Sequence, residues 1–328
     1  MYLGQKMYTF FHLTENASEY YLEINLQNIR LNIADGNKIS LPLEMVEVLS
    51  GKRVTVSGRA PLWLYMYVAL QVYQYGASEI LIKQAQDTVA VKIFPCSSGC
   101  EPSSPITLYG TFEKTLVFEY LCSRNNPVTP EELPVLLHVL PEKNNLFETI
   151  VISGKIPNYL AGAAAIEAWR KGWRNIECFV PQEGGTAAVI PDIHRGGEFP
   201  ELKSHGVIIG VIGDPNSGKS VFSELLEQSG NAAGETLWRF DCDYAAPTPN
   251  WYLDMIKNQQ EKEGKELRST YKGKWVPGAE EELVAQLLQM RKYIPTIIAD
   301  LPGGLHKKDL VQRDCKRFLR MCPFFPAI

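Results

Sequence analysis

Over the first 195 residues, short segments with alternating apolar and polar positions are separated by longer helical patterns. Alternation with a period of two predicts half-buried strands, and the apolar stretch from Ala60 to Tyr73 favours a helix. We expect an α+β fold for this part of the chain. The expected elements are strands at 7–13, 20–25, 53–57, 78–83 and 88–94, with helices at 41–49 and 61–75.

The same arrangement occurs twice. The segment from Val54 to Pro61 matches the segment from Ile150 to Pro157, because each is an apolar strand that ends in Ser-Gly-basic-x-Pro. Further matches, also 96 positions apart, continue through the following helix and strand. An internal repeat that keeps one register across several elements indicates two related units. We expect these units at 1–95 and 105–195, with the turn-forming linker 95–105 between them.

A different pattern begins past residue 200. The apolar run Val207–Ile212 predicts a strand, and Val221–Leu226 predicts a helix. Between them stands Gly-Asp-Pro-Asn-Ser-Gly-Lys-Ser, which matches the Walker A pattern G-x-x-x-x-G-K-[ST]. The backbone N–H groups of such a turn, together with the helix N-terminus, bind phosphates. The sequence therefore predicts a P-loop nucleotide-binding domain at 206–328, with a mainly parallel α/β sheet and a site for ATP made by Gly213, Asn216, Ser217, Gly218, Lys219 and Ser220.

Acidic residues follow two further apolar runs of this domain. Asp300 ends the run that starts at Thr296, and Asp241 and Asp243 follow Trp238. An acid at the end of such a strand can hold Mg²⁺, and an acid near the second strand can accept the proton of an acceptor hydroxyl. We therefore expect Ser220 and Asp300 to bind Mg²⁺, and Asp241, Asp243 and Asp300 to be catalytic in an ATPase or phosphotransferase.

The repeated Ser-Gly-basic-x-Pro turn has a chemical use of its own. Proline suits the first position of a helix, so each turn presents backbone N–H groups at a helix N-terminus, where anions bind. Arginine adds a fork of donors for a phosphate. The sequence thus predicts two phosphate sites facing one ligand, formed by Ser57, Gly58 and Arg59 in the first copy and by Ser153, Gly154 and Lys155 in the second.

Composition limits the partners of the chain. The formal net charge of −4 gives no global field for long nucleic acids or for anionic membranes. The longest apolar stretch falls short of the length that spans a bilayer, and the first residues lack the design of a signal peptide. An odd, scattered set of seven cysteines is typical of reduced thiols, which predicts a cytoplasmic protein. The short third domain suggests a sheet completed by a partner subunit, so we expect a homo-oligomer.

The segment Val54-Thr-Val-Ser-Gly-Arg-Ala-Pro-Leu-Trp-Leu64 resembles the V-x-x-S-G-R-x-P-x-W-L signature of the CRISPR-associated ring nucleases of type III systems. The resemblance covers the first unit well and the second more loosely. It implies two ferredoxin-like units in tandem, forming an internal pseudo-dimer that binds cyclic tetra-adenylate in antiviral defence. The family carries a catalytic histidine late in the helix that follows the signature, whereas this chain has Tyr73 in one copy and Trp169 in the other.

Three functions follow from these patterns. The leading hypothesis is a protein that binds a cyclic oligoadenylate and degrades or modifies it, with an ATP-dependent activity in the same chain. The first alternative is a nucleoside or nucleotide kinase with a regulatory tandem module at its N-terminus. The second alternative is a nucleotide-dependent signalling switch without turnover. Whether the ring is cleaved or only bound stays open at this stage.

Overall fold

The computed structural model divides into two compact units, which are considered separately. Unit 1 comprises residues 1–199 without 181–184, and unit 2 comprises residues 200–328 together with 181–184. Both units combine helices with sheets, which confirms the mixed α and β character predicted from the sequence. No helix in the described part of the chain is long and apolar enough to cross a membrane. The described residues are 10–16, 19–26, 31, 33, 39–42, 45, 47–84, 89–96, 107–120, 128–189, 201–202, 204–213, 217–233, 237–243, 262, 265, 269 and 278–301.

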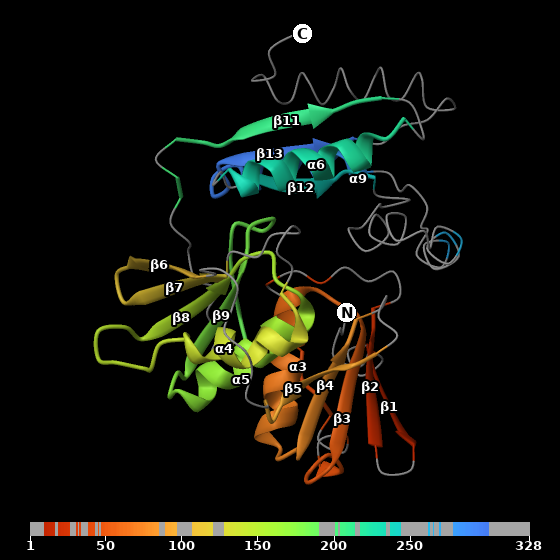
Figure 1. Cartoon of the computed structure of the whole chain (residues 1–328), viewed down its shortest axis with the longest axis vertical. Helices are drawn as coiled ribbons and strands as arrows, with labels where there is room; N and C mark the ends of the chain where they lie inside the picture. Colours follow the sequence, from red (N-terminus) through yellow and green to blue (C-terminus); the bar gives the residue numbers. More distant parts are fainter. Residues whose placement is uncertain are drawn as a thin grey trace, which may run out of the picture. The chain divides into compact units, whose positions relative to one another are not determined.

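Unit 1 contains two five-stranded sheets of the same design (Figure 1). Each sheet keeps its strands in sequence order, with a parallel centre and an antiparallel strand at either edge. The first sheet comprises β1 (Phe11–Asn16), β2 (Glu19–Asn25), β3 (Arg53–Arg59), β4 (Glu79–Lys83) and β5 (Val91–Phe94). The second comprises β6 (Thr107–Phe112), β7 (Thr115–Tyr120), β8 (Thr149–Ser153), β9 (Asn175–Val180) and β10 (Gly185–Ala188).

The elements of the two sheets repeat with the spacing of the sequence. Helix α3 (Leu62–Gln74) follows β3, and helix α5 (Asn158–Arg170) follows β8 in the corresponding position. Pro61 and Pro157 stand directly before the two helices, with extended backbones. Proline at the start of a helix loses no intrahelical hydrogen bond, so each helix begins where the turn ends. A 3₁₀ turn (Pro130–Glu132) and the short helix α4 (Leu133–His138) precede β8.

The strand order differs from the ferredoxin-like units that the resemblance implies. A ferredoxin-like unit runs β-α-β-β-α-β. In the first described sheet three strands precede α3 and two follow it, and the central strands β2, β3 and β4 pair in parallel. Parallel neighbours need crossover connections, and the segments between β2 and β3 and between β3 and β4 provide them. The result is a crossover fold with a hairpin strand at each edge.

The two sheets share one hydrophobic core, and α3 and α5 lie between them (Figure 1). The helices approach closely because α5 is rich in small residues at the contact. A methyl group added at Gly162 would lie 2.5 Å from Ile82 Cδ1 and 3.1 Å from Ala69 Cβ. Both copies therefore bury their apolar surface against each other, as the predicted internal pseudo-dimer requires.

Unit 2 contains a three-stranded parallel sheet with the order β11-β13-β12. These strands are β11 (Val207–Val211), β12 (Leu237–Asp241) and β13 (Thr296–Asp300). Helix α6 (Lys219–Ala232) follows β11 and packs against β12 and β13, and α9 (Ala279–Met290) leads into β13. The central strand β13 is almost entirely buried, as its run of apolar residues predicts.

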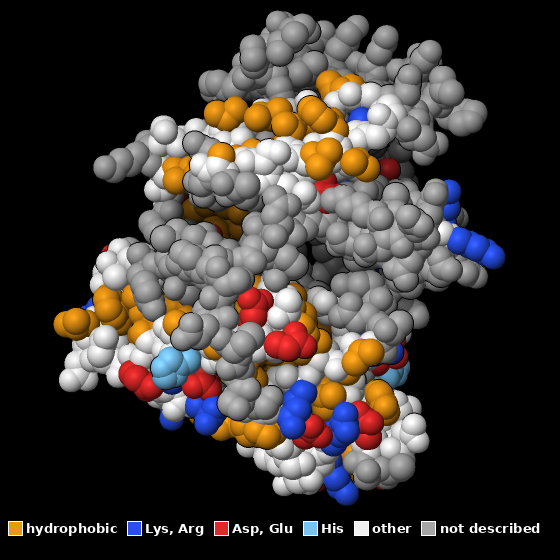
Figure 2. All heavy atoms as spheres, viewed as in Figure 1, with side chains coloured by type: hydrophobic (Ala, Val, Ile, Leu, Met, Phe, Trp, Pro, Cys, Tyr) orange, Lys and Arg blue, Asp and Glu red, His pale blue; other side chains and the backbone are white. Residues whose placement is uncertain are grey.

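Helix α6 buries polar residues and exposes apolar ones. Ser223, Glu224 and Glu227 are buried, whereas Phe222 is 54% exposed and Leu225 is 48% exposed. Phe222, Leu225 and the exposed side chains of β11 form an apolar surface over β11 and α6 (Figure 2). Buried polar side chains need polar or charged partners, so we expect such groups on the face of the sheet that α6 covers.

Glycine is required at Gly58 but not at Gly51, although both have positive φ. A methyl group at Gly58 would lie 2.1 Å from the Ile24 carbonyl oxygen, whereas nothing lies within 4 Å at Gly51. We expect Gly51→Ala to cost about 1 kcal/mol of stability and Gly58→Ala to cost at least about 3 kcal/mol. Thermal unfolding of the full chain measures both, and equal losses would contradict the close approach at Gly58.

Candidate functional site

The loop after β11 carries the residues of the predicted nucleotide site. Gly213 lies two residues beyond the end of β11, and α6 begins at Lys219. A methyl group at Gly213 would lie 2.8 Å from Ser217 Oγ and 3.2 Å from Lys219 Cγ. The side chain of Lys219 therefore folds back over Gly213 rather than extending away from the loop. Asn216 belongs to the predicted site as well but lies outside the described residues.

The start of α6 has the geometry expected of a phosphate-binding turn. Gly218 has a φ of 85°, a conformation that glycine adopts without strain. Its carbonyl oxygen accepts a hydrogen bond of 2.8 Å from the Phe222 N–H, which is the first bond of the helix. The N–H groups of the first helical turn have no acceptor within an α-helix and carry the positive end of its dipole. Ser220 belongs to this turn and is half-buried.

The carboxyl ends of the three strands of unit 2 fall at one edge of the sheet. Asp300 is the register partner of Val211 on one side and of Asp241 on the other. The alignment continues beyond the strands, since the Leu301 N–H donates to the Val211 carbonyl and the Cys242 N–H to the Asp300 carbonyl. The parallel sheet therefore brings the acids of β12 and β13 to the edge from which the Walker A turn begins.

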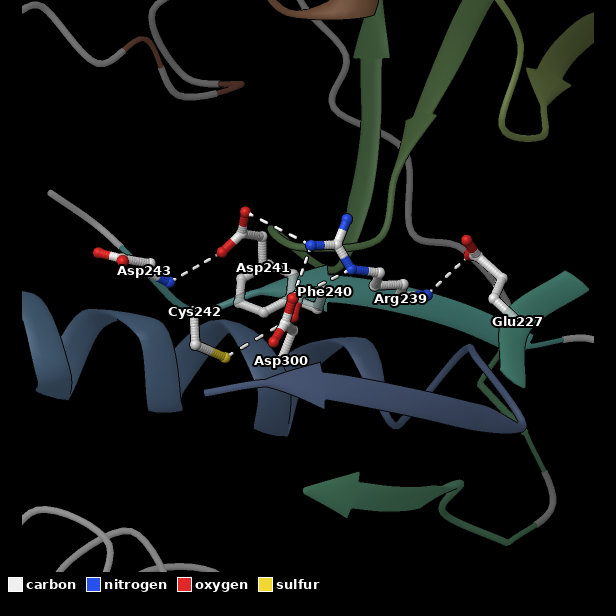
Figure 3. Close-up of polar contacts among 7 residues, drawn as sticks. All are labelled: Glu227, Arg239, Phe240, Asp241, Cys242, Asp243 and Asp300. Atoms are coloured by element: carbon white, nitrogen blue, oxygen red, sulfur yellow. Dashed lines mark hydrogen bonds and ion pairs between the residues drawn. The ribbon is translucent and has the colours of Figure 1, made fainter. Parts of the chain in front are cut away.

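An arginine that the sequence did not single out lies between these acids (Figure 3). Arg239 of β12 donates to Asp300 Oδ2 from Nη2 at 2.6 Å and from Nε at 3.3 Å. Its Nη2 also lies 3.8 Å from Asp241 Oδ2. The side chains of Arg239 and Asp300 are 3% and 4% exposed, so this ion pair is almost completely removed from water. A buried guanidinium needs such partners because an unpaired charge in the interior is costly.

Two further carboxylates, those of Glu227 and Asp241, accept hydrogen bonds from the backbone on either side of this ion pair. The Glu227 carboxylate of α6 accepts the Arg239 backbone N–H at 2.7 Å, which ties the helix to β12. Asp241 Oδ1 accepts the Asp243 backbone N–H at 2.9 Å and so closes the turn after β12. Burial, followed by the charges of Asp241 and Asp300, raises the pKa of the Cys242 thiol well above its usual value. Cys242 therefore stays a neutral thiol and packs as an apolar group.

The predicted Mg²⁺ role of Asp300 does not fit this arrangement. One oxygen of its carboxylate accepts two hydrogen bonds from Arg239, and the side chain is closed to solvent. Among the described residues no group of three or more His, Cys, Asp or Glu side chains is placed to hold a metal ion. The acids expected to be catalytic thus come together, but Asp300 forms a salt bridge instead of an open metal site.

The sequence contained a signal for this cluster. Arg239 stands between Trp238 and Phe240 in a strand whose other residues are mainly apolar, and a charge in such a position requires a buried partner. The polar residues on the buried side of α6 are a second signal. Neither pattern identifies Asp300 as the partner, because the order of strands in the sheet decides that contact.

In unit 1 the two Ser-Gly-basic turns occupy equivalent places. Gly58 has a φ of 118° and Gly154 a φ of 114°. A methyl group on Gly154 would lie 2.3 Å from the Tyr120 carbonyl oxygen, which is the same close approach that Gly58 makes to the preceding strand. Arg59 is exposed, Lys155 is half-buried, and Ser153 is buried. Each turn ends its strand at the start of α3 or α5.

Both turns lie at the same end of unit 1. Tyr73, near the end of α3, makes an edge-to-face contact of 4.8 Å with Phe94 at the end of β5. The pKa of the Cys96 thiol, which follows β5 closely, is raised by burial and then by the charge of Glu167 near the end of α5. The two helices thus end near the same segment. Their first residues, and the turns that precede them, lie toward the opposite end of unit 1.

The helix positions where the resembling family carries a histidine lie away from these turns. Tyr73 packs on Phe94, and the guanidinium of Arg174 lies 4.0 Å above the ring of Trp169. Glu119 lies closer to the second turn than Tyr73 and Trp169 do, because it is the register partner of Ser153. Burial raises the pKa of the Glu119 carboxyl beside the second turn, because burial disfavours the charged form.

Comparisons with protein-family models, with curated proteins and with solved structures found no match. The geometry of the two kinds of turn is therefore the observation that bears on function.

Removing one partner of the Arg239–Asp300 pair is expected to destabilise unit 2 strongly. Arg239→Gln leaves Asp300 as an unpaired buried charge and should cost roughly 3–5 kcal/mol. The double variant Arg239→Gln with Asp300→Asn removes both charges and should lose clearly less than the single variant. Chemical denaturation of the full chain measures the three proteins. If the double variant lost as much unfolding free energy as the two single variants together, a direct interaction between Arg239 and Asp300 would be contradicted.

Proposed function

We propose that unit 2 binds a nucleoside triphosphate, with ATP as the first candidate. The observation that carries this proposal is the position of Lys219, which begins α6 and folds its side chain over Gly213 at the end of β11. A lysine in that position can contact the β- and γ-phosphates of a nucleotide held by the turn. The helix N-terminus adds donors and a favourable dipole at the same place.

The activity of this domain follows from the acids at the same edge. Asp241 is engaged in the turn after β12 and lies near Arg239. Asp243 follows it and is half-buried. Asp241 and Asp243 are the candidates for the acid that orients an acceptor hydroxyl or water, in a phosphotransferase or ATPase. A switch that binds ATP without turnover is the alternative, favoured by the closed state of Asp300.

Lys219→Ala should weaken ATP binding by the full chain by about tenfold or more, because a charged contact to the phosphate is removed. The matched control is Lys292→Ala, since Lys292 also belongs to unit 2 but pairs with Glu201 at 3.3 Å on the surface. Isothermal titration with ATP provides the affinities. An ATP affinity that is the same in Lys219→Ala as in the unchanged chain would refute the P-loop assignment.

A second proposal concerns unit 1, which we infer binds cyclic tetra-adenylate between its two turns. The equivalent geometry of Gly58 and Gly154, at one end of a pseudo-symmetric unit, is the supporting observation. A ring of identical nucleotides presents the same phosphate more than once, so two equivalent anion sites suit it better than they suit an asymmetric ligand. Arg59 and Lys155 then add positive charge at each site.

This proposal favours binding of the ring over its cleavage. Transfer of the ribose 2′-hydroxyl proton requires a base near the phosphate, and tyrosine and tryptophan are unsuited to that role at neutral pH. Tyr73 and Trp169 lie at the far ends of their helices and pack against neighbours. In this proposal the chain acts in the cytoplasm as a receptor for an antiviral second messenger, and ATP bound to unit 2 governs its state or its chemistry.

Arg59→Ala should weaken the binding of labelled cyclic tetra-adenylate by about tenfold, because a bidentate contact to phosphate is lost. Lys155→Ala should have a smaller effect, since an ammonium group offers no such fork. Arg53→Ala is the control, because Arg53 lies at the other end of β3 and pairs with Glu19 and Glu79. Unchanged affinity in both turn variants would count against a site at these turns.

A further inference from the structure

Arg239 contacts Asp300, the residue at which the sequence predicts a divalent cation. Its guanidinium lies between the carboxylates of Asp300 and Asp241, at the carboxyl ends of β13 and β12 (Figure 3). Asp241 Oδ1 is engaged by the Asp243 N–H, and Asp300 Oδ2 accepts two bonds from Arg239. The positive charge at this edge is therefore supplied by the protein itself.

We propose that Arg239 takes the electrostatic role of a divalent cation at this edge, so that ATP binding by unit 2 does not require Mg²⁺. This inference rests on the proposed nucleotide site and extends it. Guanidinium remains charged at every physiological pH, so its contribution is permanent. It also provides several fixed donors in a fork that matches the geometry of a carboxylate.

The surroundings of Arg239 argue against displacement by a metal ion. Mg²⁺ requires a nearly ideal octahedron of oxygen ligands and keeps several waters, whereas the side chain of Asp300 is 4% exposed. A cation that reached Asp300 would also lie beside the guanidinium and be repelled by it. On the helix side, Glu227 is already committed to the Arg239 backbone, which holds the strand and its side chain in place.

The pairing of the strands places Arg239 and the Walker A turn at the same edge of the sheet. Arg239 and Asp300 are 61 positions apart in sequence but meet because β12 and β13 pair in parallel. Asp300 is in turn the register partner of Val211, two residues before Gly213. Arg239 is thus a positioning residue. Arg239 contributes positive charge at the carboxyl ends of the strands, near which the phosphates would bind. Lys219 is the residue that would contact the phosphates.

The test compares ATP binding by the full chain in Mg²⁺ and in EDTA, by isothermal titration. We expect the two affinities to agree within about threefold, well below the tenfold change that marks a lost strong contact. A direct titration with Mn²⁺ alone, followed by its electron paramagnetic resonance signal, should show no bound metal. Binding of ATP that depends on Mg²⁺ by tenfold or more would overturn the inference while leaving the nucleotide site intact.

Variants of the pair sharpen the test. Asp300→Asn removes one of the two carboxylates that pair with Arg239, so ATP affinity should rise by the same factor in both buffers. If Asp300 were a metal ligand, this variant would lose affinity in Mg²⁺ alone. Arg239→Gln should make binding dependent on Mg²⁺ by about tenfold, since the acids then need another cation. The double variant, Arg239→Gln with Asp300→Asn, should lose that dependence again.

The outcomes separate the inference from the function on which it rests. Absence of ATP binding in both buffers refutes the nucleotide site itself, and Lys219→Ala provides the reference for that result. If Arg239→Gln does not fold, Asp300→Asn alone decides, because it keeps the shape of the buried carboxylate. A fall in affinity of Asp300→Asn that is confined to Mg²⁺ would overturn the role of Arg239.

Discussion

Parallel pairing of strands is the constraint on which the candidate sites depend. Parallel neighbours send their carboxyl ends to the same edge of a sheet, and every return of the chain needs a crossover. In unit 2 this places the turn after β11 beside the end of β13, at the edge of the sheet where β12 also ends. In unit 1 the same rule places the turns after β3 and β8 at the starts of α3 and α5. All the chemistry considered for this chain lies at such edges, where open parallel sheets bind their ligands.

The two units use this edge in different ways. Unit 1 offers two equivalent turns, each with an obligatory glycine and an added basic side chain, on a rigid core shared by both copies. Unit 2 offers one turn with a lysine and places a buried ion pair behind it. A buried pair contributes little net stability compared with apolar packing, but it restricts which arrangement of the strands is allowed. The pair of Arg239 and Asp300 therefore specifies the site more than it stabilises the unit.

Local patterns in the sequence predicted the elements and turns but not the contacts between distant strands. Glycine and proline mark the turn between β3 and α3 so strongly that both copies are visible in the sequence, and Lys219 is found at the helix start that its motif requires. The pairing of Arg239 with Asp300 depends on strand order, which no local pattern encodes. For the same reason the parallel centre of each sheet in unit 1 differs from the ferredoxin-like order, because a strand pattern does not reveal its neighbour.

Hydrogen–deuterium exchange of the full chain, with and without ATP, tests the central claim most directly. Phosphates bound at the turn would accept hydrogen bonds from its backbone N–H groups and slow their exchange. The account predicts protection of peptides that span residues 207–226, with the carboxyl ends of β12 and β13 protected as well and the turns of unit 1 unaffected. Exchange at 207–226 that stays the same in saturating ATP, or protection confined to unit 1, would contradict it.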